Sequence, residues 1–512
     1  MSEKTKNLLP DQTLANKLIS KGFWLYLFAF LGLPLWYLIR VILSNDLSVW
    51  EVGIIYSLIS LMSILSILST LGISQWAMVY FLPKYIVDNK PDYVSTIYKI
   101  VRYINIWMTL VVGLAFYFFI QYFWTAYIEH PESISILYIF LWVFLFLNLR
   151  KPIEWIYKTV QNVFVPKFTE FLKQVLISIL LISFFLLGIW DLINYGYAFL
   201  IWWIISYLIY YIVFRYKYAW EILAWKFIKD NELFKKIMFF WISALIAANA
   251  MLIIKNIDMQ MLLIISWAES AGYYTNYMSL IAIVMFFLSP ILWLLFPIIS
   301  ELKSKGQIEK LKLLQNFLYK YFIVFAFSII FLLGVFGEEI AVILFWEDFL
   351  YSGTLLSYLV IFGIFKLIFT INLAILMWIW EAKKRTNILI WVMVLNIVLN
   401  ALLIPTLGAL GAGIATGISW AVIAVASFYF VNQHQKINFD WLFYGKNFLF
   451  LLIISSIYYL FAKDLFVLEN AYRYSNLMYI VAIWFFTYLI MFGLNFKEAK
   501  IFVKELKRFK KS

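Results

Sequence analysis

Residues 51–73 read EVGIIYSLISLMSILSILSTLGI, and Glu51 is the only charged residue among them. An α-helix rises about 1.5 Å per residue and the hydrocarbon core of a bilayer is about 30 Å thick, so about 20 apolar residues cross it. The stretch therefore predicts a transmembrane helix. Because the same pattern recurs along the chain, we expect an all-α, polytopic membrane protein.

We expect about fourteen transmembrane helices, each from a run of about 20 mainly apolar residues. They lie near residues 22–43, 51–73, 98–123, 136–158, 169–190, 193–214, 238–264, 272–298, 315–336, 355–380, 387–405, 408–431, 446–462 and 476–494. Hydrophobic residues make up 65% of the chain and charged residues 13%, whereas soluble domains average about 45–50% and about 25%. No segment between the spans is long enough for a soluble catalytic domain, so we expect no enzyme.

Residue usage excludes several classes of site. The chain has no cysteine and only two histidines, which excludes disulfides, thiolate chemistry and clustered imidazole ligands. It contains no glycine-rich phosphate loop that ends in Lys-Ser or Lys-Thr, so no ATP site is recognised. We expect no metal and no bound cofactor. Coupling to a Na⁺ or H⁺ gradient or to the membrane potential stays open.

The 41 Lys and Arg residues give a net charge of +13, and their positions decide what that charge means. If both termini are cytoplasmic, nearly all of these residues fall in cytoplasmic loops, whereas acidic residues such as Asp46 and Asp191 fall in the opposite loops. This distribution follows the positive-inside rule. The charge therefore indicates a multi-pass protein of the cell (plasma or inner) membrane with both termini inside, and not a nucleic-acid-binding protein.

A long basic loop divides the predicted helices into two blocks of six, followed by two additional helices. The predicted parts are an N-terminal lobe (1–215), a cytoplasmic linker (216–237), a C-terminal lobe (238–435), helices thirteen and fourteen (436–496) and a basic tail (497–512). The tail is expected to be an interfacial helix. Both blocks begin on the same side, so a duplication would relate them by an axis along the membrane normal. Glu-Val-Gly53 and Ser-Ala-Gly272 are a faint echo of such a repeat.

Three basic residues lie inside predicted spans, namely Arg40, Lys255 and Lys366. A charge at the centre of a bilayer costs at least about 2.5–3.5 kcal/mol, so such residues usually face a polar cavity. Arg40 lies near the outer end of its helix, where snorkelling to the interface is an equal alternative. Lys366 lies near the middle of its helix, too deep to snorkel easily, which favours a cavity role.

The predicted helix at 238–264 carries two groups of polar residues. Lys255 and Asp258 are three residues apart, close enough on one face to form a self-neutralising pair. Asn249, Asn256 and Gln260 form a second stripe, rotated from the first by more than about 100°. We do not expect a helix with two polar faces to be surrounded by lipid.

Arg150, Lys151 and Glu154 follow the most apolar part of the predicted helix at 136–158. If the helix continues to about residue 158, these side chains line the inner half of a cavity. If it stops at residue 149, they are ordinary positive-inside residues. The sequence leaves both alternatives open.

Several segments stand in a recognisable order along the chain. They are Arg40 with Leu47-Ser-Val-Trp-Glu-Val-Gly53, Phe81-Leu-Pro-Lys-Tyr85, Ile257-Asp258 with Gly272-Tyr-Tyr274, and Gly411-Ala-Gly-Ile-Ala-Thr416. Their order and spacing resemble the polysaccharide repeat-unit flippases (Wzx-type) of the multidrug/oligosaccharidyl-lipid/polysaccharide exporter superfamily. The resemblance implies a MATE-like fold with two six-helix lobes around a cationic cavity that opens alternately to each side. Arg40 and Asp258 match family positions, whereas Lys255 and Lys366 rest on their predicted depth.

The resemblance implies a flippase that moves a lipid-linked, pyrophosphate-linked oligosaccharide to the outer leaflet, for a surface polysaccharide such as O-antigen. The substrate-binding candidates are Arg40, Lys255, Lys366, Arg150 and Lys151. The candidates for ion coupling or for a polar cavity wall are Asp258, Glu154, Asn249, Asn256 and Gln260. The expected partners are the lipid-linked oligosaccharide and membrane lipids, and association with a polysaccharide polymerase or with glycosyltransferases stays open.

Three other functions compete with this one. A cation-coupled multidrug exporter would need acidic residues in its cavity, whereas the charges inside the spans are mainly basic. A peptidoglycan-precursor flippase would carry a similar lipid-linked cargo. A membrane glycosyltransferase or polymerase would need a large extramembrane loop, and the longest predicted outer loop is residues 337–354.

Overall fold

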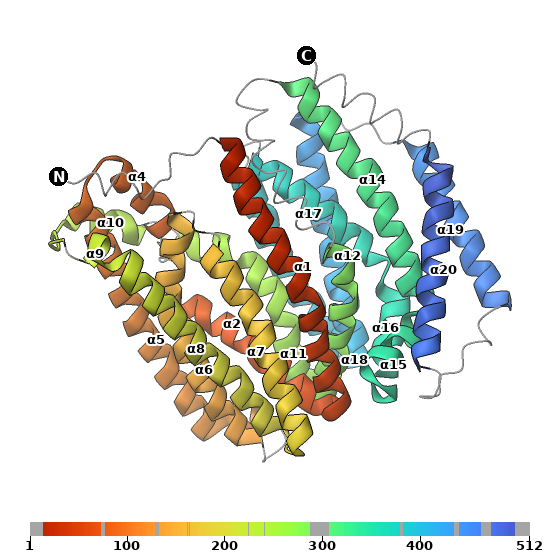
Figure 1. The fold of residues 1–512 in the computed structure, drawn as a ribbon, viewed down its shortest axis with the longest axis horizontal. Helices are drawn as coiled ribbons and strands as arrows, with labels where there is room; N and C mark the ends of the chain where they lie inside the picture. Colours follow the sequence, from red (N-terminus) through yellow and green to blue (C-terminus); the bar gives the residue numbers. More distant parts are fainter. Residues whose placement is uncertain are drawn as a thin grey trace. The chain divides into compact units, whose positions relative to one another are not determined.

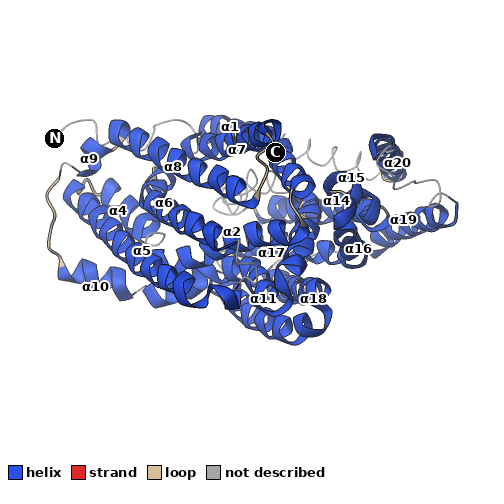
Figure 2. Cartoon of the chain, turned by 90° about the horizontal axis from the view of Figure 1, so that it is seen from below, coloured by secondary structure: helices blue, strands red, loops and turns tan. Residues whose placement is uncertain are grey.

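The chain is helical throughout the part that its computed structural model describes. The described residues are 14–72, 77–127, 133–160, 162, 164–223, 225–239, 241–286, 307–378, 382–434, 440–461 and 473–496. Every regular element in these ranges is a helix and none is a strand (Figure 2). The chain is therefore an all-α membrane protein, as predicted. The predicted interfacial helix at 497–512 lies outside the described residues.

The helices form two compact units, Met1–Gly272 and Tyr273–Ser512. The first contains α1 (Leu14–Asp46), α2 (Val49–Thr70), a π-helical turn (Ala77–Phe81), α4 (Leu82–Val87), α5 (Pro91–Tyr127), α6 (Ile134–Thr159), α7 (Phe164–Leu187), α8 (Leu192–Lys217), α9 (Ala219–Leu223), α10 (Asn231–Phe239) and most of α11 (Trp241–Ile281). In this unit α7 packs on α1, and α6 packs on α5 and α8 (Figure 1). The lobe boundaries near residues 215 and 238 stay predictions.

The second unit contains the end of α11 and the helices that follow. These are α12 (Ile283–Phe286), α14 (Ile308–Val335), α15 (Gly337–Phe345), a 3₁₀ turn (Glu347–Phe349), α16 (Leu350–Leu359), α17 (Phe362–Trp378), α18 (Ala382–His434), α19 (Trp441–Phe461) and α20 (Arg473–Leu494). The most extensive packing in this unit joins α17 to α18, and α14 packs on α17, α19 and α20.

By length and composition, eight helices among the described residues can cross a membrane, or ten when each of two bent pairs counts as one span. Two of the eight are longer than one crossing needs, because α11 and α18 have 41 and 53 residues. Each consists of two helices joined at a kink, at Trp267 (φ 69°) in α11 and at Gly408 (φ 53°) in α18. The total of fourteen spans stays a prediction.

The structure corrects the prediction between residues 315 and 380. The predicted outer loop at 337–354 is largely helical, since it contains α15, the 3₁₀ turn and the start of α16. The chain bends by 75° between α14 and α15, where the span predicted at 315–336 ends, and by 66° between α16 and α17, inside the span predicted at 355–380. The bend near Gly337 lets α15 pack on α16 with backbones so close that a Cβ at Gly353 would lie 2.5 Å from the Gly337 carbonyl oxygen.

The start of α2 packs closely on the part of α11 that ends the first unit, and a glycine on each helix permits the contact. We call this contact the glycine crossing. The backbone N–H of Ser48 donates to the Glu51 carboxylate over 2.9 Å and so caps α2. Beyond the cap, a Cβ at Gly53 would lie 1.9 Å from the carbonyl oxygen of Ala268, and a Cβ at Gly272 would lie 2.1 Å from that of Val49. Only glycine permits backbones to approach this closely.

Replacing Gly53 with Ala is expected to destabilise the protein by about 1–3 kcal/mol, because the new methyl group meets backbone that cannot rotate away. The matched control is Gly445→Ala in α19, where a Cβ meets nothing within 4 Å. That change is expected to be neutral or stabilising, since Ala favours a helix over Gly by about 1 kcal/mol. The apparent melting temperature of the protein in detergent measures both effects, and equal values for the two variants would contradict the crossing.

Candidate functional site

The candidate site begins on the last turns of α6. This helix continues to Thr159 despite Pro152 in its interior, so Arg150, Lys151 and Glu154 are helical residues. Of the two alternatives left open by the sequence, the longer helix is the one observed. The charged side chains are therefore fixed in position by the helix, and they project from it at spacings of one to four residues.

Glu154 is shared by two cations on its own helix. Its carboxylate lies 3.1 Å from the Arg150 guanidinium and 2.8 Å from the Lys158 ammonium. Lys151 also interacts electrostatically with Glu154, and with the two other cations. One carboxylate therefore faces three positive charges, so the end of α6 carries a net positive charge.

Arg150 is also held by α8. Its guanidinium donates to the Ser206 hydroxyl over 2.7 Å and lies 4.8 Å from the ring centres of both Trp203 and Tyr210. A guanidinium over an aromatic ring gains about 0.5–2 kcal/mol, with the larger value where water is excluded. These contacts and the Glu154 bond fix Arg150 between α6 and α8, which favours a positioning role for it.

The structure adds two residues of α7 that the sequence analysis did not select. Lys173 interacts electrostatically with Glu170, Arg150 and Lys255, and Glu170 accepts a hydrogen bond from Lys167 over 2.8 Å. The sequence did contain a signal for Lys173, since this basic residue lies four residues inside the span predicted at 169–190. It was overlooked because it is close to the basic loop that precedes the span.

Lys255 on α11 is the next cation of this group. Lys255 interacts electrostatically with Arg40 as well as with Lys173. Lys255 is exposed whereas Asp258 is 1% exposed, and among the described residues no ion pair joins the two. The self-neutralising pair that the spacing allowed is therefore not observed among the described residues, and the two side chains differ in exposure although they are three residues apart.

Arg40 is buried between two aromatic rings. It is 7% exposed, and its guanidinium carbon lies 4.8 Å from the ring centre of Trp36 on α1 and 4.1 Å from that of Tyr56 on α2. A snorkelling arginine would extend its charged end into water. The burial instead favours an interior position. We call Arg150, Lys173, Lys255 and Arg40 the cationic row.

The polar stripe of α11 contacts α2. The Ser60 hydroxyl donates to the backbone carbonyl of Asn256 over 2.7 Å, and the Gln260 amide donates to the carbonyl of Ser57 over 2.8 Å. The Asn256 amide donates to the Leu252 carbonyl of its own helix, and Asn249 is 6% exposed. Asn256 and Gln260 therefore lie where α11 is bonded to α2, which favours a packing role for both.

Lys366 belongs to the second unit. Its ammonium lies 4.6 Å from the ring centre of Trp420 on α18, and it is only partly exposed. A buried polar network lies in the same unit, where the Tyr319 hydroxyl donates to Asn372, and the Asn372 amide donates to the Ser427 hydroxyl over 3.1 Å. The sequence analysis missed this network, although Asn372 is an amide inside the span predicted at 355–380.

Comparison with known proteins defines the family. The sequence model of the family described as polysaccharide biosynthesis protein matches residues 18–303, more than half of the chain. The chain belongs to this family. A relative of this polysaccharide biosynthesis protein is an uncharacterized membrane protein of Methanocaldococcus jannaschii, 24% identical over 462 residues, with 86% of this chain and 89% of that protein covered.

Solved transporters share the fold of this polysaccharide biosynthesis protein. The lipid II flippase MurJ in an inward closed conformation superposes with a TM-score of 0.66 at 17% identity, covering 94% of this chain and 99% of MurJ. An inward-facing multidrug resistance MATE transporter gives a TM-score of 0.58 at 14% identity, covering 79% and 98%. The predicted polysaccharide biosynthesis family and the MATE-like fold are therefore confirmed, and the apolar helices show that the chain is a multi-pass membrane protein.

Replacing Glu154 with Ala is expected to cost up to about 3 kcal/mol of stability, because it leaves Arg150 and Lys158 without their shared carboxylate. The matched control is Glu170→Ala, whose pair with Lys167 is exposed by 38% and 56% and should contribute less than about 1 kcal/mol. Melting temperatures of the purified proteins distinguish the two. A larger decrease in melting temperature for Glu170→Ala would show that Glu154 does not stabilise the end of α6.

Proposed function

We propose that this protein moves a lipid-linked oligosaccharide with an anionic phosphate or pyrophosphate linkage from the cytoplasmic to the outer leaflet by alternating access. The observation that carries the proposal is the cationic row of the first unit. Its members come from α6, α7, α11 and α1 and are near enough to influence one another electrostatically. Such an arrangement is costly for a membrane helix bundle unless an anion offsets it.

The cargo and the row have complementary requirements. A pyrophosphate and its sugars do not cross hydrocarbon unaided, because each unpaired charge or hydroxyl costs several kcal/mol. Cations within the spans offset that cost for the linkage while the lipid tail remains in the bilayer. A polar route beside apolar helices suits an amphipathic cargo better than it suits a small soluble one.

The members of the row have different proposed roles. Arg150 is bonded to Glu154 and Ser206, so it holds the end of α6 in place. Lys255 is exposed, and it interacts electrostatically with other cations of the row. Lys255 is therefore the residue that gains most from an arriving phosphate, and we assign it the first contact with the cargo. Lys366 is proposed to contribute from the second unit.

The energy for export has two proposed sources. With the cytoplasm negative, outward movement of each negative charge gains about 2.3 kcal/mol per 100 mV. If Na⁺ or H⁺ is coupled, Asp258 is the stronger candidate, since it is 1% exposed, whereas Glu154 already pairs with Arg150 and Lys158. Both proposals assume that the termini are cytoplasmic.

The competing functions differ in the charge that they need. A multidrug resistance MATE transporter has a similar fold. A cation-coupled exporter, however, requires acidic residues in its cavity, whereas the first unit of this chain has a cationic row. A peptidoglycan-precursor flippase requires an anionic linkage as well, and the MurJ likeness is compatible with it. The identity of the saccharide therefore separates these two flippases.

Replacing Lys255 with Gln is expected to slow translocation at least tenfold, because a charge-assisted contact to a phosphate contributes about 1.5–3 kcal/mol. The measurement uses proteoliposomes that contain a polyprenyl-pyrophosphate-linked oligosaccharide, and it scores the fraction that a membrane-impermeant glycosidase can reach over time. Lys255→Arg keeps the charge and should retain most of the activity. Lys167→Gln removes an exposed cation near the same row and should change the rate less than about twofold.

The same assay tests the alternatives. Transport of lipid II at the higher rate would support the peptidoglycan-precursor flippase. Equal rates for wild type and Lys255→Gln, together with uptake of a cationic dye, would overturn the proposal in favour of a drug exporter. Copurification from membranes would test the proposed association with a polymerase or with glycosyltransferases.

A further inference from the structure

The segment between α9 and α10 is tied to the first turns of α5. Residues 225–230, which we call the strap, lie along this helix through backbone hydrogen bonds. The N–H of Lys226 donates to Asp92 over 3.2 Å, and the N–H of Ile228 donates to Thr96 over 2.9 Å. The carbonyl of Trp225 accepts from Ser95 over 3.2 Å and from the Lys99 ammonium over 2.9 Å. These hydrogen bonds hold the strap against α5 within the first unit.

Helix α10 follows the strap and orients a phenylalanine outward. Asp230 caps the helix, since its carboxylate accepts from the N–H groups of Glu232 and Leu233 at 2.9 and 3.0 Å. Leu233 and Ile237 are buried in the core of the first unit. Phe234, which adjoins Leu233, is 45% exposed. The helix thus has one face in the core and leaves an aromatic side chain beside α5.

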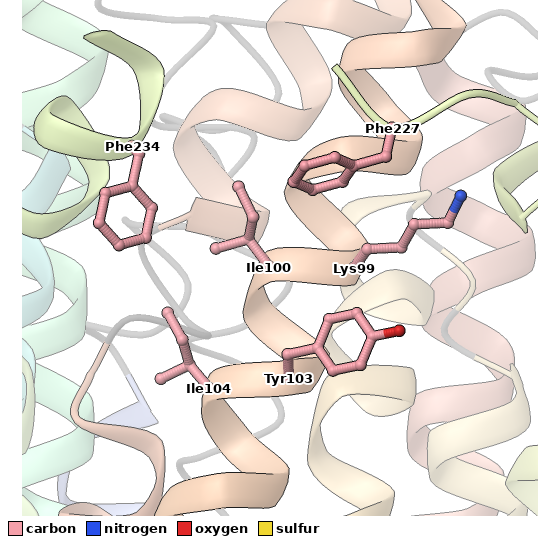
Figure 3. Close-up of a pocket in the computed structure, with 6 residues that line it drawn as sticks. All are labelled: Lys99, Ile100, Tyr103, Ile104, Phe227 and Phe234. Carbon is pink, nitrogen blue, oxygen red and sulfur yellow. The ribbon is translucent and has the colours of Figure 1, made fainter. Parts of the chain in front are cut away.

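A cavity of about 480 Å³ lies between α5, the strap and α10 (Figure 3). It is lined by Lys99, Ile100, Tyr103, Ile104, Phe227 and Phe234. Its volume is within the range of about 300–1,000 Å³ that is common for ligand sites. Four of its six residues are apolar, and Phe227 is 52% exposed and Tyr103 63% exposed, so the walls suit a hydrocarbon chain and open to the surroundings of the protein.

One basic residue lines the cavity, and two more adjoin its lining residues in the sequence. Lys99 lines it, Lys226 directly precedes Phe227, and Lys235 directly follows Phe234. Lys226 and Lys235 are exposed. The nearby carboxylates of Asp92 and Asp230 accept backbone N–H groups, so their charge is partly offset. The entrance therefore favours an anion next to an apolar wall.

The cavity also lies near one end of a candidate membrane span. It opens near the beginning of α5, whose candidate span begins at Pro91, and Tyr103 and Trp107 are exposed on this helix. Exposed Trp and Tyr residues are typical of the level of the lipid headgroups. Clustered lysines at that level attract anionic lipids of the cytoplasmic leaflet.

We propose that this cavity binds an anionic phospholipid of the cytoplasmic leaflet. Its phosphate contacts Lys99, Lys226 and Lys235, and an acyl chain lies along Ile100, Ile104 and the two phenylalanines. The bound lipid joins the strap and α10 to α5 from the outside. This site is separate from the cationic row and does not depend on the identity of the cargo.

The test uses the complete protein in nanodiscs of phosphatidylcholine with a minor fraction of phosphatidylglycerol. Native mass spectrometry counts the phosphatidylglycerol molecules that remain bound. Each lysine near an anionic surface contributes about fivefold to affinity, so Lys226→Ala/Lys235→Ala should weaken binding about 25-fold. The control Lys84→Ala/Lys383→Ala removes two exposed lysines elsewhere and should leave the affinity within about twofold.

A second variant tests the apolar wall without changing the charge. Ile104→Trp places a larger side chain in the cavity and should lower phosphatidylglycerol retention at least fivefold, with an unchanged melting temperature in lipid-free detergent. Equal losses in both lysine variants, or full retention by Ile104→Trp, would overturn the proposal, since either result indicates diffuse attraction to the surface. Preferential retention of a polyprenyl phosphate over phosphatidylglycerol would also overturn it and would assign the cavity to the tail of a transported lipid.

Discussion

The absence of water from the hydrocarbon core is the constraint on which the structure depends. Each backbone N–H and C=O must find a partner within the protein, and a helix meets this demand within one segment. Polar side chains follow the same rule. Asn148, Asn256 and Asn447 each donate to the carbonyl four residues earlier on their own helix. An amide in a spanning helix therefore need not mark a binding site.

Charged residues meet this constraint only in part within one helix. Glu154 offsets part of the positive charge at the end of α6. Of the rest of the cationic row, Lys173 interacts electrostatically with Glu170 of its own helix, and Arg40 lies between the rings of Trp36 and Tyr56. MurJ and the MATE transporters have this fold with different named cargoes. The fold alone therefore leaves the cargo open, and the charges particular to this chain carry the functional information.

The sequence predicted the helices well because hydropathy is a local property that each span carries by itself. The bends at Phe336 and at the break between α16 and α17 were not predictable, since they depend on packing partners such as the Gly337 and Gly353 backbones. The surroundings of the candidate site residues also depend on packing between helices. Helical spacing placed Lys255 and Asp258 together, but it could not tell that one is exposed and the other buried. Lys173 joins the row only through the packing of α7 between α6 and α1.

The glycine crossing is reciprocal. The offset that aligns Gly53 with Gly272 also aligns Val49 with Ala268, and these are the residues whose carbonyls the two glycines approach. In an isologous interface between identical subunits, residue i of one subunit contacts residue j of the other, and residue j of the first contacts residue i of the second. The two glycine contacts follow the same pattern. The crossing therefore has, within a single chain, the internal symmetry of such an interface.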